Sequence, residues 1–144
     1  MKKISKIEKL ELILPPAPKP LGVYKPTIII DNFLYVSGQG PVKSDGSLII
    51  GKVGKDMDKH EAKKAARQVG LTMISSIVSN IENVEKIKRI VKVFGMVNCG
   101  SNFYDHPFVI NGFSELMSEI FGEDFGIGVR SAVGMTLPGN IPVE

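Results

Sequence analysis

Tryptophan is absent from the 144-residue sequence, and cysteine occurs only once, as Cys99. A single cysteine excludes an internal disulfide framework and a zinc site built from several cysteines, and it indicates a reducing compartment. No uninterrupted apolar run approaches the ~20 residues that a membrane span requires. Charged residues interrupt the N-terminal segment where a signal peptide needs an apolar stretch, so the sequence predicts a cytoplasmic protein.

Strong catalytic motifs are also missing. The turn at residues 38–40 lacks the third glycine and the following helix of a dinucleotide-binding loop. Neither His60 nor His106 has a second metal ligand at helical spacing, so we expect no metal and no other cofactor. Cys99 and His106 could act as nucleophile and base. A structural role is the preferred interpretation, because buried cysteines usually behave as small hydrophobic residues.

The chain is mildly basic, with a formal net charge of +3. Such a balance invites a nucleic-acid interpretation. Aromatic residues make up only 7% of the sequence, however, and no run alternates them with basic residues as a base-stacking surface would. We therefore interpret the lysines as solvated surface, with RNA contact as the less favoured alternative.

Hydrophobic periodicity predicts an appended helix and one α+β domain. Apolar residues at helical spacing indicate a short amphipathic helix over residues 4–14, which ends at Pro15 and Pro16. We expect the N-terminal helix and linker over residues 1–15 and a single domain over 16–144. The expected strands are residues 27–30, 33–37, 47–50, 90–97 and 129–135, and the expected helices are 58–80 and 107–121, with one turn from Asn83 to Ile87. Two helices on one face of a mixed, mostly antiparallel sheet would form a two-layer sandwich.

Arg130 is the most conspicuous polar residue. It lies near the start of an otherwise apolar strand, where burial of a guanidinium costs desolvation free energy unless an anion binds it. Its planar fork fits a carboxylate. A ligand carboxylate and a salt bridge to an acidic residue of the same or a neighbouring subunit are equally open at this point. Glu144 and Tyr24 are the next polar candidates, and Tyr24 could instead be an ordinary packed aromatic.

Several motifs resemble one known family in order and spacing. They are PLGVY at residues 20–24, LYVSGQGP at 34–41, FVING at 108–112, and VRSAVG at 129–134 followed by Leu137-Pro138. Together they are similar to the Rid (YjgF-like) proteins, also called endoribonuclease L-PSP. The likeness runs from about Pro16 to the last residue and is closest to a less studied branch with an N-terminal helix.

This resemblance implies a chorismate-mutase-like homotrimer with ligand clefts between subunits. It further implies an imine or enamine deaminase, which hydrolyses 2-imino acids to 2-keto acids and ammonia without a cofactor. Arg130 and Glu144 would be its catalytic residues, the first holding the substrate carboxylate and the second positioning water. The implied substrate-binding residues are Arg130, Tyr24, Gly38, Asn111 and Ala132.

Two features of the chain leave other functions open. Ala132 stands where many deaminases of the family carry a cysteine, and Glu144 is the final residue. A non-catalytic trimer that binds small carboxylate metabolites is therefore the main alternative, and a ribonuclease or RNA-binding protein is less favoured. The expected partners are a small carboxylate metabolite and two further copies of the chain, without a membrane or nucleic acid.

Overall fold

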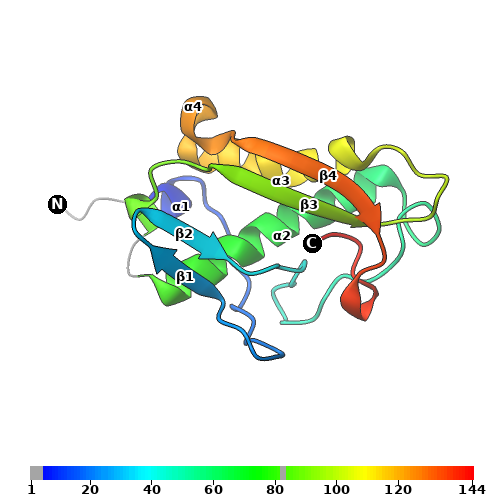
Figure 1. The fold of residues 1–144 in the computed structure, drawn as a ribbon, viewed down its shortest axis with the longest axis horizontal. Helices are drawn as coiled ribbons and strands as arrows, with labels where there is room; N and C mark the ends of the chain where they lie inside the picture. Colours follow the sequence, from blue (N-terminus) through cyan, green and yellow to red (C-terminus); the bar gives the residue numbers. More distant parts are fainter. Residues whose placement is uncertain (1–4, 82–83) are drawn as a thin grey trace.

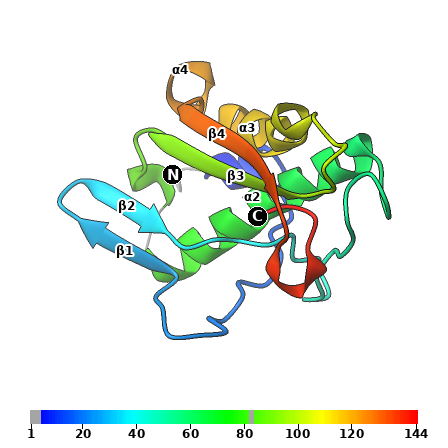
Figure 2. The ribbon, with the colours of Figure 1, turned by 45° about the vertical axis from the view of Figure 1, so that its right-hand side comes forward.

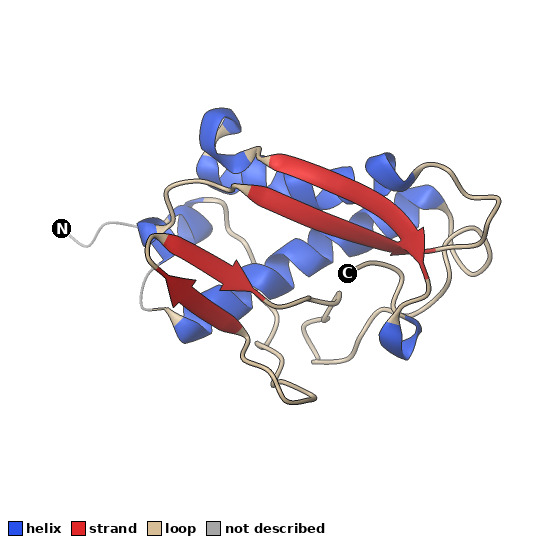
Figure 3. Ribbon diagram, viewed as in Figure 1, coloured by secondary structure: helices blue, strands red, loops and turns tan. Residues whose placement is uncertain are grey.

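The computed structural model describes residues 5–81 and 84–144. Strands form one layer and the long helices form a second layer on one side of them (Figures 1 and 3). The elements are α1 (Lys6–Lys9), β1 (Thr27–Ile30), β2 (Phe33–Val36), α2 (Lys59–Asn80), β3 (Lys92–Asn98), α3 (His106–Phe121), α4 (Glu123–Gly126) and β4 (Val129–Met135), with 3₁₀ turns at Val84–Lys86 and Pro138–Asn140. The predicted α+β fold is confirmed. None of the described helices is both long and apolar enough to cross a bilayer.

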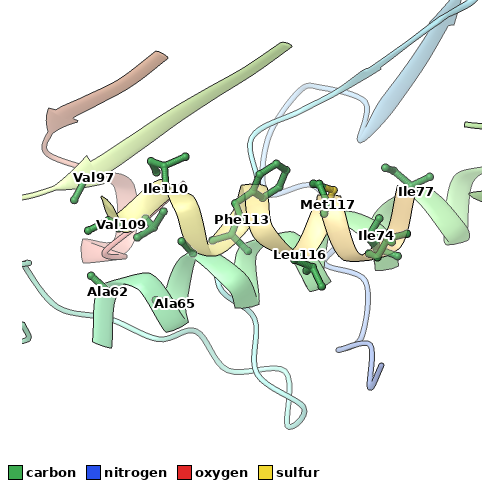
Figure 4. Packing of buried hydrophobic residues seen from close by; sticks show 14 of the residues in the cluster. Ala62, Ala65, Ile74, Ile77, Val97, Val109, Ile110, Phe113, Leu116 and Met117 are labelled. Carbon is green, nitrogen blue, oxygen red and sulfur yellow. The ribbon is translucent and has the colours of Figure 1, made fainter. Parts of the chain in front are cut away.

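The two long helices form the core with the β3–β4 face. Asp58 caps α2 through a reciprocal capping box with Glu61, as the sequence predicts. Figure 4 shows α3 packed along α2 with buried side chains from both helices, and Val97 of β3 beside Val109 at the start of α3. Gly112 permits this close approach, because a Cβ there would overlap the backbone carbonyl of Lys63 on α2.

The strands form two short ladders. β1 and β2 pair antiparallel, and β3 and β4 pair parallel with α3 as their crossover. At its other edge β3 is joined by the end of the chain, where Val143 bridges Val97 in antiparallel register. The expectation of a single, mostly antiparallel sheet is therefore wrong in detail for the described residues. The hairpin lies beside the parallel pair rather than hydrogen bonded to it (Figure 2).

The expected strand at residues 47–50 is also wrong. Its segment makes only an isolated bridge, between Leu48 and Val42. The backbone and side chain of Ser47 both donate to the Asp45 carboxylate, at 2.9 and 2.6 Å. The first of these bonds uses the Ser47 backbone N–H, which a continued ladder would need, so the pairing stops at the single bridge.

The N-terminal helix is shorter than expected. Ser5 and Glu8 form a capping box, but helix α1 covers only Lys6–Lys9. Glu11 adopts a left-handed conformation with φ 52°, which ends helical geometry. Leu12 and Leu14 still pack against the core from this irregular segment. Their apolar spacing therefore reflects burial and not a longer helix. The division into residues 1–15 and 16–144 stays a prediction, and Asn83 lies outside the described residues.

Candidate functional site

Strand register decides which way Arg130 points. In the parallel pair, Arg130 lies opposite Val93, Ala132 opposite Gly95 and Gly134 opposite Val97. Val97 is fully buried in the helix-facing core. Residues two apart on a strand share a face. Arg130 and Ala132 therefore lie on the α3 side of β4.

The Arg130 guanidinium is held by two neutral acceptors on α3. Its Nη1 donates to Ser114 Oγ at 3.1 Å, and its Nη2 donates to the Pro107 carbonyl at 3.2 Å. Asn111 lies between these two positions, because residues 107, 111 and 114 form one stripe of the helix. No acidic side chain within the described ranges forms an ion pair with Arg130; the ion pairs there are Lys59–Asp105, Lys63–Glu115 and Arg67–Glu119.

Arg130 therefore forms no salt bridge with any described residue of its own chain. The side chain is half-buried, and its charge is met only by a hydroxyl and a carbonyl. A guanidinium has five N–H donors, so three remain after these two bonds. This arrangement is suited to receive an anion.

Glu144 belongs to a second group. Its backbone exchanges two hydrogen bonds with Met96 on β3, at 2.9 and 3.0 Å. Val143 is buried in the core, so the next side chain, that of Glu144, points to the opposite face of the strand layer. There the carboxyl group fills the space that a side chain at Gly38 would need. Burial raises the pKa of Glu144 above the ordinary value for a glutamate.

Tyr24 lines a pocket of about 350 Å³ together with Ser37, the residue next to Gly38. The Ser37 hydroxyl donates to the Lys25 carbonyl at 2.6 Å, which joins the segment before β1 to the end of β2. Tyr24 is half exposed. The structure therefore brings Gly38 and Glu144 together, with Tyr24 in a pocket beside the same turn.

The predicted site residues thus fall into two groups within one chain. Arg130, Ala132 and Asn111 lie between β4 and α3, whereas Glu144 and Gly38 lie on the other face, beyond β3. In Figures 1 and 2 the C-terminus lies between the end of β2 and the β3–β4 pair. A single chain does not place Arg130 and Glu144 at one reacting centre.

Cys99 and His106 do meet, as a contact of 3.2 Å between Sγ and Nε2. Gly134 makes room for them, because a Cβ there would lie 2.5 Å from Nε2 and 2.9 Å from Sγ. Burial raises the pKa of the Cys99 thiol, and the nearby charge of Lys52 lowers it less. The thiol therefore keeps its proton near neutral pH, which favours the structural interpretation.

Sequence reasoning missed Ser114 and the carbonyl of Pro107. Ser114 lies three residues beyond Asn111, a spacing that places both on one helix face. From this spacing, Ser114 could have been predicted to lie beside Asn111 at the candidate site. No sequence feature marks the Pro107 carbonyl. No three histidine, cysteine or acidic side chains gather as a metal site among the residues described.

Comparisons with known proteins agree with this architecture. Residues 5–139 match the family model described as "YjgF/chorismate_mutase-like, putative endoribonuclease". Protein TCP17 of Trypanosoma cruzi is 32% identical over 96% of this chain and 87% of its own length.

Two solved structures are also similar. Atu1372 of Agrobacterium tumefaciens, described as a protein of unknown function, is 35% identical over 96% of this chain and 86% of that one, with a TM-score of 0.84. Escherichia coli TdcF, solved with bound serine, is 19% identical over 88% and 87% of the two chains, with a TM-score of 0.60, a likeness of fold alone. Since the family model spans nearly the whole sequence, the chain belongs to the YjgF/chorismate mutase-like family.

Proposed function

We propose that the protein hydrolyses 2-imino acids to 2-keto acids and ammonia. The observation that carries this proposal is the half-buried Arg130 guanidinium, which is bound by two neutral acceptors and by no carboxylate of the described chain. A ligand carboxylate would supply the missing negative charge through a two-pronged contact. The serine bound to TdcF also carries a carboxylate, which is consistent with this class of ligand.

The reaction needs a water molecule and a group that moves protons. Water adds to the imine carbon, and the resulting carbinolamine then loses ammonia as its C–N bond breaks. Glu144 would accept a proton from the attacking water and pass it to the imine nitrogen. It would then take the hydroxyl proton of the carbinolamine and pass it to the same nitrogen as ammonia leaves and the carbonyl forms. Burial raises the pKa of Glu144, and a carboxyl group whose pKa lies nearer neutrality transfers protons in both directions more readily. Orientation of the imine beside Arg130 would supply much of the remaining acceleration.

We further propose that the site is completed in a homotrimer. Phe33, Tyr35 and Phe94 are about half exposed, at 51%, 55% and 55%. Their strand neighbours Leu34, Val36 and Val93 pack against the core, so these aromatic side chains lie on the opposite face of the strands. Exposed aromatic patches of this kind usually mark an interface. A second copy would bring its Glu144 face toward the Arg130 group of the first.

Light scattering should give a particle mass of about 47 kDa, three times the chain mass of 15.7 kDa. A particle of single-chain mass would contradict the trimer.

Hydrolysis of imines generated in solution from an amino acid and an amino acid oxidase tests the activity. We expect the protein to shorten the lifetime of the imine. The rate should fall as the solution is acidified through the raised pKa of Glu144, since the base must be ionised to accept a proton. Glu144→Gln should remove most of the activity, and the activity that remains should no longer fall as the pH is lowered. An unchanged imine lifetime would contradict the proposal, and RNA as substrate would test the endoribonuclease of the family description.

A non-catalytic carboxylate binder is the second candidate. The groups that touch Arg130 are a serine hydroxyl and a carbonyl, and neither is a base at neutral pH. The neighbouring side chain at position 132 is a methyl group. Binding of a 2-keto acid without imine hydrolysis would favour this candidate.

A further inference from the structure

Ser114 differs from the other residues of α3 because its side chain forms a hydrogen bond with the Arg130 guanidinium. Ser114 Oγ and the Pro107 carbonyl each accept one N–H, from Nη1 and Nη2 respectively. Two bonds to separate guanidinium nitrogens determine the plane of the group, which a single bond would leave free to rotate. Both acceptors are neutral, so they orient the guanidinium without neutralising its charge.

We propose that Ser114 is a positioning residue, which fixes the plane of the Arg130 guanidinium so that its remaining N–H groups are available to a ligand carboxylate. This inference rests on the carboxylate-binding role proposed above. An arginine side chain has many rotamers, and immobilising it during binding costs entropy. A guanidinium already held by Ser114 and the helix backbone has lost that freedom before the ligand arrives, which strengthens binding.

The residue type at position 114 matters for charge as well as geometry. An acidic residue there would hold Arg130 more strongly, but it would take the place of the ligand carboxylate. A serine holds the guanidinium and leaves its charge available. The proposal therefore predicts that Ser114→Asp keeps Arg130 ordered and still weakens ligand binding.

The chain offers a matched control in Ser118. It lies one turn beyond Ser114 on the same stripe of α3, and the hydroxyl that accepts from Arg130 is that of Ser114. Ser118→Ala removes the same oxygen from the same helix face. Ser114→Thr is the conservative variant, because it retains a hydroxyl at the contact position.

Two measurements on the full chain test the inference. Side-chain ¹⁵N–¹H spectra report the order of the Arg130 guanidinium without any ligand; Arg130 is one of three arginines, and its signals are assigned by their loss in Arg130→Lys. Calorimetry with pyruvate, a small 2-keto acid, reports binding. For Ser114→Ala we expect shifted and broadened Arg130 signals and a dissociation constant raised about five- to tenfold. Ser118→Ala and Ser114→Thr should stay close to the parent.

Each outcome bears on a different claim. Unchanged Arg130 signals in Ser114→Ala would overturn the positioning role, whatever the affinity for pyruvate. Altered signals with unchanged pyruvate binding would also overturn it, while leaving the carboxylate site intact. If the parent itself binds no pyruvate, the carboxylate site fails, and with it the role of Ser114 in that site.

Discussion

Replacement of Arg130 by alanine should lower kcat/KM for imine hydrolysis by about 100-fold, because the substrate carboxylate loses its charge-assisted contact. Arg130→Lys should fall between this variant and the parent, with a loss of about tenfold, since lysine keeps the charge but not the planar fork. Steady-state kinetics on imines generated in solution would measure both. The contacts to Ser114 and Pro107 leave three N–H donors of Arg130 for the substrate.

Arg89→Ala is the control for this comparison. The Arg89 side chain is exposed, and its guanidinium donates a hydrogen bond to the Asp124 carbonyl at 3.4 Å. Its loss removes one positive charge without touching either group of candidate site residues. A variant Arg130→Ala that retains the kcat/KM of the parent would show that Arg130 has a structural role instead.

Gly112→Ala should lower the free energy of unfolding by about 3 kcal/mol, measured by urea denaturation at a fixed protein concentration. The added methyl group would overlap the Lys63 carbonyl and lie 3.1 Å from the Arg67 backbone nitrogen. Both atoms belong to the backbone of α2, so no side-chain rotation can relieve the overlap. Alanine has the higher helix propensity, but that gain is only about 1 kcal/mol.

Gly100→Ala provides the matched substitution. A Cβ at Gly100 would meet no atom within 4 Å, and its φ lies outside the left-handed region. We expect its free energy of unfolding to stay within about 0.5 kcal/mol of the parent value. Equal stability of Gly112→Ala and the parent would mean that α2 and α3 do not approach as closely as the structure shows.

Local signals in the sequence predict the main elements well. Asp58 and Glu61 mark the start of α2, and the apolar periodicity of α3 continues to Phe121. These elements are confirmed because their signals are chemical and local. The segment before Pro15 shows the limit of such reasoning, since Leu12 and Leu14 reach the core without the predicted helix.

The candidate site could be predicted only in part. Resemblance identifies Arg130, Glu144 and Gly38 as single residues, and their roles stay predictions. Their separation onto two faces depends on the parallel register of β3 and β4 and on the return of residue 143 to Val97. Such long-range pairings leave no periodic trace in the sequence. The contact between Arg130 and Ser114 depends on the same tertiary packing.

Complementation between two inactive variants tests the central claim most directly, namely that two copies of the chain complete one site. Arg130→Ala and Glu144→Gln would be unfolded together in equal amounts, refolded, and assayed for imine hydrolysis. If each cleft takes Arg130 from one subunit and Glu144 from another, about one quarter of all clefts in the randomly reassembled trimers carry both native residues. We therefore predict recovery of about a quarter of the parent activity. A refolded mixture no more active than the separate variants would contradict the shared site.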